Sequence, residues 1–234
     1  MTTELTLADL EALKQWDTPT ICNALEVLTP ERRTRGFTVE PLLCAFPDLP
    51  PIVGYARTVR IRSMNKQEGD VATIKAQRLA YYQYVQDGPT PSIIVLQDID
   101  PIPGFGSFWG EVQSNIHKGL GALGTITNGC VRDIDACAEG FQFISGSVKP
   151  SHAWVHTVDF DVNVTVCGME VSPGDVIHAD RHGCVIVPDY VVKKIPATVD
   201  LLTRQEAVLI EASQKPGFSV DDLREAFEKQ ADIH

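Results

Sequence analysis

Residues 92–127 carry the pattern that most restricts how this chain can fold. Ser92-Ile93-Ile94-Val95-Leu96 is a continuous apolar run of the kind that forms a buried parallel strand. A helix is predicted over 110–119, with apolar residues four positions apart, and Leu123–Thr127 is predicted as a second strand that ends at the Asn128-Gly129 turn. Because parallel neighbours need a crossover, this strand-helix-strand order predicts an α/β fold.

The flanking segments supply the other predicted elements. Two short helices open the chain, one with a capping box at Thr6-Leu7-Ala8-Asp9 and one capped by Thr18-Pro19. A strand over 54–62 and a helix over about 70–86 follow, and alternation over 158–166 predicts a half-exposed strand that reverses near Gly168. Residues 175–179 and 184–187 are predicted to pair as a hairpin, and the chain beyond Pro188 to be helical, with Ser219-x-x-Asp222 as a cap.

Charge and cysteine usage exclude several classes of function. Lys and Arg number 20 against 31 Asp and Glu, giving a net charge of −11, so we expect no direct binding to nucleic acid. The six cysteines include no C-x-x-C pair. There is no signal-peptide pattern, and no apolar stretch approaches the ~20 residues that span a bilayer, so we expect a cytoplasmic protein without membrane contact.

Arg132 and Asp133 are the most informative candidate site residues. They follow the second predicted strand, at the carboxyl edge where ligands gather in open α/β sheets. On a turn, Asp133 could bind a hard cation while Arg132 binds a carboxylate or an enolate oxygen. By local sequence alone, the alternative is that Asp133 caps a short helix running to Glu139 and Arg132 pairs with Asp135.

A second candidate element begins at Gly110, where the helix over 110–119 starts. The backbone amides of Gly110, Glu111, Val112 and Gln113 could receive a substrate carboxylate, and Gly110 would allow its close approach. The intervening helix and strand should return Glu111 and Arg132 to one sheet edge. The alternative for Glu111 is an acidic side chain that only stabilises a helix N-terminus.

Other motifs point to no chemistry. Gly119 to Gly124 matches G-x-G-x-x-G but follows a helix, the reverse of the dinucleotide-binding order, so we interpret it as a helix end and a turn. His152, His156, His178 and His182 form no recognised metal-ligand set and are interpreted as structural or surface residues. Neither a G-x-S-x-G elbow nor a P-loop lysine is present.

The candidate residues resemble the RraA-like family. This family includes the divalent-metal-dependent 4-hydroxy-4-methyl-2-oxoglutarate and 4-carboxy-4-hydroxy-2-oxoadipate aldolases and the regulator of ribonuclease activity. The resemblance runs from about Asp17 to Tyr190, and its most specific part is Gly110-Glu111, then twenty residues, then Arg132-Asp133. The helix over 17–25 and the hairpin over 173–188 resemble the family's opening helix and closing hairpin.

The resemblance implies an architecture. It is an α/β/α sandwich of the swivelling phosphohistidine-domain type with helical N- and C-terminal extensions. The chain would form a single domain, residues 1–234, with its core at about 17–190 and a C-terminal helical extension at about 191–234. Homotrimers or homohexamers with sites between subunits are expected.

The resemblance also implies an activity, cleavage of a carbon–carbon bond in a small 2-oxo acid. Mg²⁺ or Mn²⁺ would be held by Asp133 and by water, Arg132 would bind the substrate and stabilise its enolate, and Glu111 would orient metal-bound water. The amides of Gly110 to Gln113 would hold the substrate carboxylate. A cation and a guanidinium suit this reaction, because cleavage of the carbon–carbon bond leaves negative charge on the former keto oxygen.

Departures from the family pattern leave the substrate open. Glu111 stands where Asp is often found, and further acid or base residues are not placed in the 41–51 loop or the C-terminal region. We therefore expect decarboxylation of an oxaloacetate-type acid ahead of a named aldol cleavage. The alternatives are a non-catalytic regulator that binds a ribonuclease or another protein, favoured by the acidic charge, and a related sugar-acid lyase.

Overall fold

The strand, helix and strand predicted over residues 92–127 are present in the structure, a computed structural model that describes residues 5–234. β3 (Ser92–Asp98) and β4 (Ala122–Val131) are parallel neighbours connected through α4 (Glu111–Gly119). Their register pairs Ile93 with Gly124 and Leu96 with Thr127. The α/β class expected from this pattern is confirmed.

The other elements follow the predicted order, but two strands of the large sheet, at residues 43–44 and 142–148, were not predicted. The helices are α1 (Leu7–Leu13), α2 (Thr18–Leu28), α3 (Val71–Gln86), α5 (Ile195–Ser213) and α6 (Val220–Ala231), with short 3-10 helices at Pro30–Arg32, Ile134–Ala136 and Asp189–Lys194. The strands are β1 (Leu43–Cys44), β2 (Ile52–Arg62), β5 (Gln142–Val148), β6 (His156–Phe160), β7 (Val164–Val166), β8 (Met169–Val171), β9 (Val176–Asp180) and β10 (Gly183–Ile186). The capping boxes at Thr6 and Ser219 are as predicted, whereas α2 is capped by Asp17 and begins at Thr18.

One large mixed sheet organises the molecule, with strand order β1-β5-β4-β3-β2-β9-β10 and β6 added beside β2. β2 through β5 are parallel, and the outer pairings are antiparallel. The chain before and at β1 nearly closes the sheet, because the Thr38 amide donates to the Cys184 carbonyl and the Ala45 amide to that of Phe143. The strands therefore curve around an interior face that is shielded from water.

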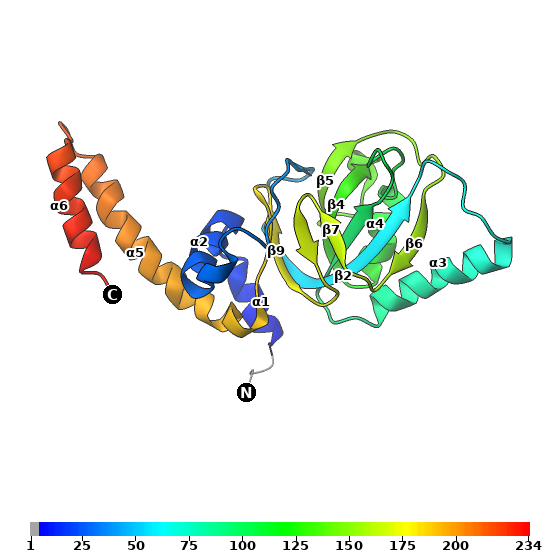
Figure 1. Cartoon of the computed structure of the whole chain (residues 1–234), viewed down its shortest axis with the longest axis horizontal. Coiled ribbons are helices and arrows are strands. Elements are labelled where there is room, and N and C mark those ends of the chain that lie inside the picture. The colour runs from blue at the N-terminus through cyan, green and yellow to red at the C-terminus, as the bar shows by residue number, and fades with distance from the viewer. Residues whose placement is uncertain (1–4) are drawn as a thin grey trace.

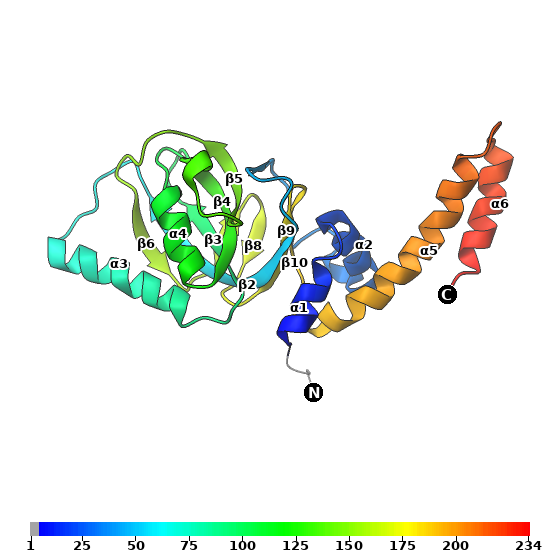
Figure 2. The same cartoon turned by 180° about the vertical axis from the view of Figure 1, so that it is seen from behind.

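Alternation along β3 shows which layer covers each face. Ile93 and Val95 point into the sheet interior, where the β7–β8 hairpin fills the space with Val166 and Met169. Ile94 and Leu96 point outward beneath α3 and α4, and Figure 2 shows α4 lying across β3 and β4. The layers thus differ from the expected sandwich, because a β-hairpin rather than a helical layer covers the inner face.

The remaining helices pack at the β9–β10 end of the same outer face. Leu10, Leu13 and Ile21 of α1 and α2 form one core cluster with Val176 of β9 and Val199 of α5. α5 then continues away from the sheet with α6 folded back along it, whereas α3 lies on the far side of the molecule (Figure 1). No helix within residues 5–234 combines the length and apolarity that crossing a bilayer requires.

Two local predictions at β4 and the segment after it are wrong. β4 continues through Asn128-Gly129 to Val131, because the Asn128 side chain bonds with the backbone of Asp98 on β3 instead of turning the chain. The predicted helix from Asp133 to Glu139 is only the 3-10 turn at Ile134–Ala136.

The apolar face predicted for α4 is largely turned outward. Val112 is 65% exposed and Ile116 is 36% exposed, while Ser114 and His117 are the buried residues of this helix. The strand predicted over 158–166 is also divided, because Asp161 has a φ of 61° and separates β6 from β7. The reversal near Gly168 and the β9–β10 hairpin are as predicted.

Candidate functional site

The two predicted site segments meet at the carboxyl end of β4. Trp109 and Val131 form a parallel bridge, and the Arg132 amide donates to the Trp109 carbonyl at 3.1 Å. This bridge places Gly110, the residue before α4, directly beside the Arg132-Asp133 pair. The predicted return of both segments to one sheet edge is therefore present.

Gly110 allows this meeting because it has no side chain. A Cβ built on Gly110 would lie 2.7 Å from Asp133 Oδ2 and 3.2 Å from Arg132 Cγ. The backbone of Gly110 is extended, with φ of −179°, so any residue could adopt its conformation. Glycine is required here by the close approach of the Asp133 carboxylate and not by backbone strain.

The Arg132 guanidinium is held by two neighbours. Its Nη2 lies 3.3 Å from Asp133 Oδ2 and 2.7 Å from His152 Nε2. Because a guanidinium only donates, His152 Nε2 must be the acceptor, which places the proton of the neutral imidazole on Nδ1. The Nε and Nη1 donors of Arg132 are engaged by no other residue of the described chain.

Asp133 does not play the structural role that its local sequence suggested. It occupies the N-cap position of the Ile134–Ala136 turn, but its side chain makes no cap hydrogen bond. Its φ of 54° lies in the left-handed region, which costs free energy in a residue other than glycine. The ion pair of Arg132 is formed with Asp133 and not with Asp135. Both observations weigh against the structural alternatives.

A cavity of about 540 Å³ opens beside these residues. Its lining includes Gly110, Glu111, Val112, Gln113, Arg132 and His152. The first intrahelical bond of α4 is from the Ser114 amide to the Gly110 carbonyl, so the amides of residues 111–113 are not used within the helix. The Gln113 side chain is engaged, since its Oε1 accepts from the Tyr82 hydroxyl at 3.0 Å.

The charge of this cavity is opposite to that of the whole chain. Lys66, Arg78 and Arg132 line it, and Glu111 is its acidic residue. In a chain with a net charge of −11, such a concentration of cations favours an anionic ligand.

The carboxylates of Glu111 and Asp133 both affect the pKa of the Cys137 thiol. Burial raises the pKa of the Cys137 thiol, and the Asp133 and Glu111 carboxylates raise it further. Both carboxylates therefore add negative potential around this thiol. The pairing of an acidic residue at 111 with the Arg-Asp motif stays a prediction.

The residues at Asp133 fit a hard cation that keeps most of its water. Its side chain is 34% exposed and, within the part of the chain that the structure describes, accepts no hydrogen bond apart from its contact with Arg132. Among residues 5–234, no three His, Cys, Asp or Glu side chains cluster as a metal cage. Mg²⁺ commonly binds through one or two carboxylates plus waters, so a single aspartate suits it better than it would suit zinc.

Buried aromatic packing supports the start of α4. His117 is fully buried, its Nδ1 bonds with the Gln113 carbonyl at 2.7 Å and its Nε2 with the Tyr81 hydroxyl at 2.8 Å. Burial lowers the pKa of His117 to about 4, so the ring is neutral at neutral pH. The ring packs against Trp109 at a tilt of 58°, with centroids 4.7 Å apart, which fixes the residue before Gly110.

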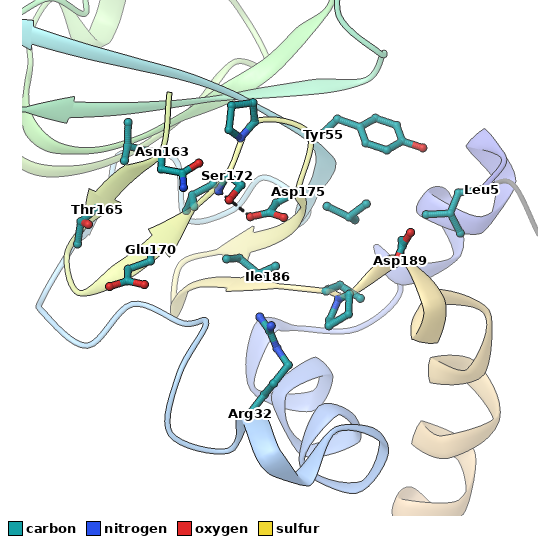
Figure 3. A pocket seen from close by; sticks show the side chains of 17 residues that line it. Leu5, Arg32, Tyr55, Asn163, Thr165, Glu170, Ser172, Asp175, Ile186 and Asp189 are labelled. Carbon is teal, nitrogen blue, oxygen red and sulfur yellow. Dashed lines mark hydrogen bonds between the residues drawn. The ribbon is translucent and has the colours of Figure 1, made fainter. Parts of the chain in front are cut away.

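A cavity larger than the one beside Arg132 lies elsewhere. It measures about 1000 Å³ and opens between the β7–β8 hairpin, β10 and the first helices (Figure 3). Arg32 points into it from below, and Glu170, Asp175 and Asp189 also lie around it. None of the predicted site residues lines this cavity, and Asp175 is already bonded to the Ser172 amide at 2.8 Å.

His152 is the residue of this site that sequence reasoning missed. It was interpreted as structural or surface because it has no ligand spacing with another histidine. It reaches Arg132 only because the Ser107 amide donates to the Ser151 carbonyl at 2.8 Å, which joins two loops far apart in the sequence. No sequence pattern predicts that loop contact.

The sequence of this chain matches a family model and is similar to several known proteins. The sequence model of the RraA-like family, described as Aldolase/RraA, matches residues 18–186. A protein of Stutzerimonas stutzeri, provisionally named a 4-hydroxy-4-methyl-2-oxoglutarate aldolase, is 30% identical over 163 residues, which cover 64% of this chain and 94% of that protein. Protein DlpA of Legionella pneumophila is 22% identical over 153 residues, 62% of this chain but only 23% of DlpA.

Solved structures share the fold. An uncharacterised protein from Pseudomonas syringae pv. tomato superposes with a TM-score of 0.70 at 22% identity, covering 98% of this chain and 97% of its own. RraAS2 of Streptomyces coelicolor, an unusual member of the RNase ES inhibitor RraA family, superposes with a TM-score of 0.65 at 20% identity, covering 91% of this chain and 99% of its own. Since the family model spans most of the chain, this protein belongs to the RraA-like family.

Proposed function

We propose that this protein is a divalent-metal-dependent lyase that cleaves a carbon–carbon bond in small 2-oxo acids. The observation that carries the proposal is the meeting of Gly110, Arg132 and Asp133 beside a cation-rich cavity. The relative named as an aldolase supports the same class of reaction. The expected substrate is an oxaloacetate-type acid, which gives pyruvate and carbon dioxide.

Each residue has a role that its position allows. The unused amides of residues 111–113 bind the substrate carboxylate at the N-terminus of α4. Arg132 donates to the 2-oxo oxygen and stabilises the negative charge that it acquires as the carbon–carbon bond breaks. Glu111, at the same helix end, orients water at the cavity. The electron pair of the broken bond is thus received as an enolate, which later takes up a proton at carbon.

The proposed cation, Mg²⁺ or Mn²⁺, would be held by Asp133 and water. When bound, it would act as a Lewis acid that stabilises negative charge on the substrate oxygen. Asp133 holds its carboxylate in place through a left-handed backbone and the contact with Arg132. Trp109 and Phe108 are packed behind the site and keep water away from that side.

The first test measures pyruvate release from oxaloacetate in Mg²⁺ or Mn²⁺, with the rate in the same metal without protein subtracted. Activity should disappear with a chelator and return with added metal. Asp133→Ala should lower kcat/KM about a hundredfold or more, because the cation loses its protein ligand. Asp135→Ala removes an exposed acid two residues away and should retain activity.

The competing function is a regulator that binds a ribonuclease or another basic protein. The net charge of −11 and the fold shared with RraAS2 favour it. Strong inhibition of a ribonuclease by the purified protein, with no turnover of any 2-oxo acid in any divalent metal, would establish that function and reject the lyase.

A further inference from the structure

His152 makes a contact that the proposed reaction does not yet explain. Its Nε2 accepts from Arg132 Nη2 at 2.7 Å, whereas Asp133 Oδ2 lies 3.3 Å from the same nitrogen. The guanidinium is therefore drawn closer to a neutral ring than to the adjacent carboxylate. Arginine and aspartate side by side would otherwise form a close bidentate pair.

We propose that His152 is a positioning residue that holds the Arg132 guanidinium away from Asp133. This inference rests on the proposed function and extends it. With Nη2 engaged by His152, the Nε and Nη1 donors are directed to the substrate, and the Asp133 carboxylate stays available to a cation. A full Arg132–Asp133 pair would satisfy each charge with the other and weaken the binding of both ligands.

The backbone around His152 is fixed from three directions. The Ser151 carbonyl accepts from the Ser107 amide at 2.8 Å, and the Trp154 amide donates to the Ser63 carbonyl at 2.9 Å. A Cβ on Gly106 would collide with the His152 carbonyl, so this loop lies directly on the loop before α4. These contacts hold an exposed side chain at a defined place.

Ala153 supports the same conclusion through its conformation. Its φ is 48°, in the left-handed region that a residue with a Cβ rarely adopts. The Ala153 amide donates to Ser151 Oγ at 3.0 Å, which helps to hold the turn. Strain of this kind next to a cavity is typical of a segment whose position serves ligand binding.

The test measures binding rather than turnover. Oxalate resembles the enolate of pyruvate, and its affinity can be measured by calorimetry in Mg²⁺, while Mn²⁺ affinity can be followed by electron paramagnetic resonance. His152→Leu should weaken both affinities about tenfold, the effect of losing one hydrogen bond to a charged group. His152→Gln retains an acceptor near the position of Nε2, so its affinities should stay within about threefold of the unaltered protein.

Two further variants test whether the effect is specific to His152 and whether it depends on Arg132. His182→Leu removes a histidine of the β9–β10 turn, whose Nδ1 contacts Asp180 and which lies outside this cavity, and both affinities should be unchanged. In an Arg132→Ala background, His152→Leu should cause no additional loss of oxalate affinity, because the residue acts through Arg132. Circular dichroism and a thermal melt verify that each variant is folded.

Failure of this inference can be separated from failure of the proposed function. If the unaltered protein binds oxalate and Mn²⁺ but folded His152→Leu binds both equally well, His152 has no positioning role and the lyase proposal stands. An equal loss in the Arg132→Ala background would also overturn the inference. If the unaltered protein binds neither probe and releases no pyruvate, the proposed function itself fails.

Discussion

Gly110 determines how the candidate site is assembled, because the space left by its missing side chain is occupied by the Asp133 carboxylate. Arg132 and Asp133 then act as a pair with distinct neighbours, His152 on one side and Gly110 on the other. At the residue scale, the site depends on a close approach between two backbones rather than on a dense cluster of charged groups.

Gly110→Ala should disable the site without unfolding the chain. The added Cβ would lie 2.7 Å from Asp133 Oδ2, so the carboxylate must move and kcat/KM for oxaloacetate should fall about tenfold or more, as small displacements in active sites do. Gly119→Ala, near the end of the same helix, is the matched control, because its Cβ would meet nothing within 4 Å. Equal activity in both variants would contradict this account of Gly110.

α4 shows how an element can contribute to a site through its buried polar face. Its buried residues are Ser114 and His117, and each has a partner: the Ala138 amide donates to Ser114 Oγ at 3.0 Å, and Tyr81 bonds with His117. The exposed Val112 lies on the opposite face. The helix is therefore oriented by hydrogen bonds and aromatic packing, which together set the direction of its N-terminus.

The buried His117 predicts a pH dependence of stability. Its pKa falls from 6.5 to about 4 on folding, so the unfolded chain takes up the proton first as the pH decreases. The free energy of unfolding should therefore drop by about 2 kcal/mol between pH 7 and pH 5 from this group alone. Burial also lowers the pKa of His178, which adds loss in the same direction.

Denaturant unfolding at pH 7 and pH 5 measures this effect. His117→Gln should show a smaller loss of stability over that interval than the unaltered protein, because Gln does not titrate. His182→Gln alters an exposed histidine of the β9–β10 turn and should keep the full loss. Identical pH dependence in the His117 variant and the unaltered protein would contradict the neutral buried ring.

The sequence was sufficient to predict the elements that depend on neighbouring residues. It was not sufficient where a contact with a distant segment determines how far an element extends or which of its faces is buried. The apolar run of β3 and the capping boxes are fixed by neighbouring residues, and both are as predicted. Asn128 looked like a turn, but its side chain bonds with Asp98 of the next strand, so β4 continues. The prediction of which face of α4 is buried failed for the same reason. The Tyr81 and Trp109 side chains that pack against His117 of α4 come from other segments.

The candidate site, like the fold, could be predicted from the sequence only in part. The spacing of Gly110-Glu111 and Arg132-Asp133 was sufficient to place both segments at one edge, because strand-helix-strand topology returns the chain there. His152 was not predictable, since its position depends on a contact between the 103–109 and 149–155 loops. The backbone conformation of the site could not be predicted from the sequence either, and the left-handed φ of Asp133 is an example.

At the scale of the whole molecule, the nearly closed sheet separates two helical groups. α3 lies on one side, and α5 with α6 extends from the other (Figure 1). Both groups expose large apolar side chains, including Val71 at 83%, Leu79 at 57%, Val220 at 73% and Phe227 at 52%. Exposed apolar surface of this extent is typical of contacts with further subunits.

We propose that these surfaces contact further copies of the chain, in the assembly of three or six copies that the family resemblance implies. Native mass spectrometry should give a mass three or six times 25.7 kDa. Replacing Val220 and Phe227 by Asp should reduce that mass if α6 contributes to the contact, whereas replacing the exposed Val112 near the cavity should not. A monomeric protein at micromolar concentration would contradict the prediction of a homo-oligomer.

The most direct test of the central claim is a crystal structure of the protein with Mn²⁺ and oxalate. The account predicts anomalous density for the metal at the Asp133 carboxylate and oxalate between Arg132 and the N-terminal amides of α4. Metal and oxalate located instead in the larger cavity around Glu170 and Asp175, with the Arg132 region empty, would contradict it.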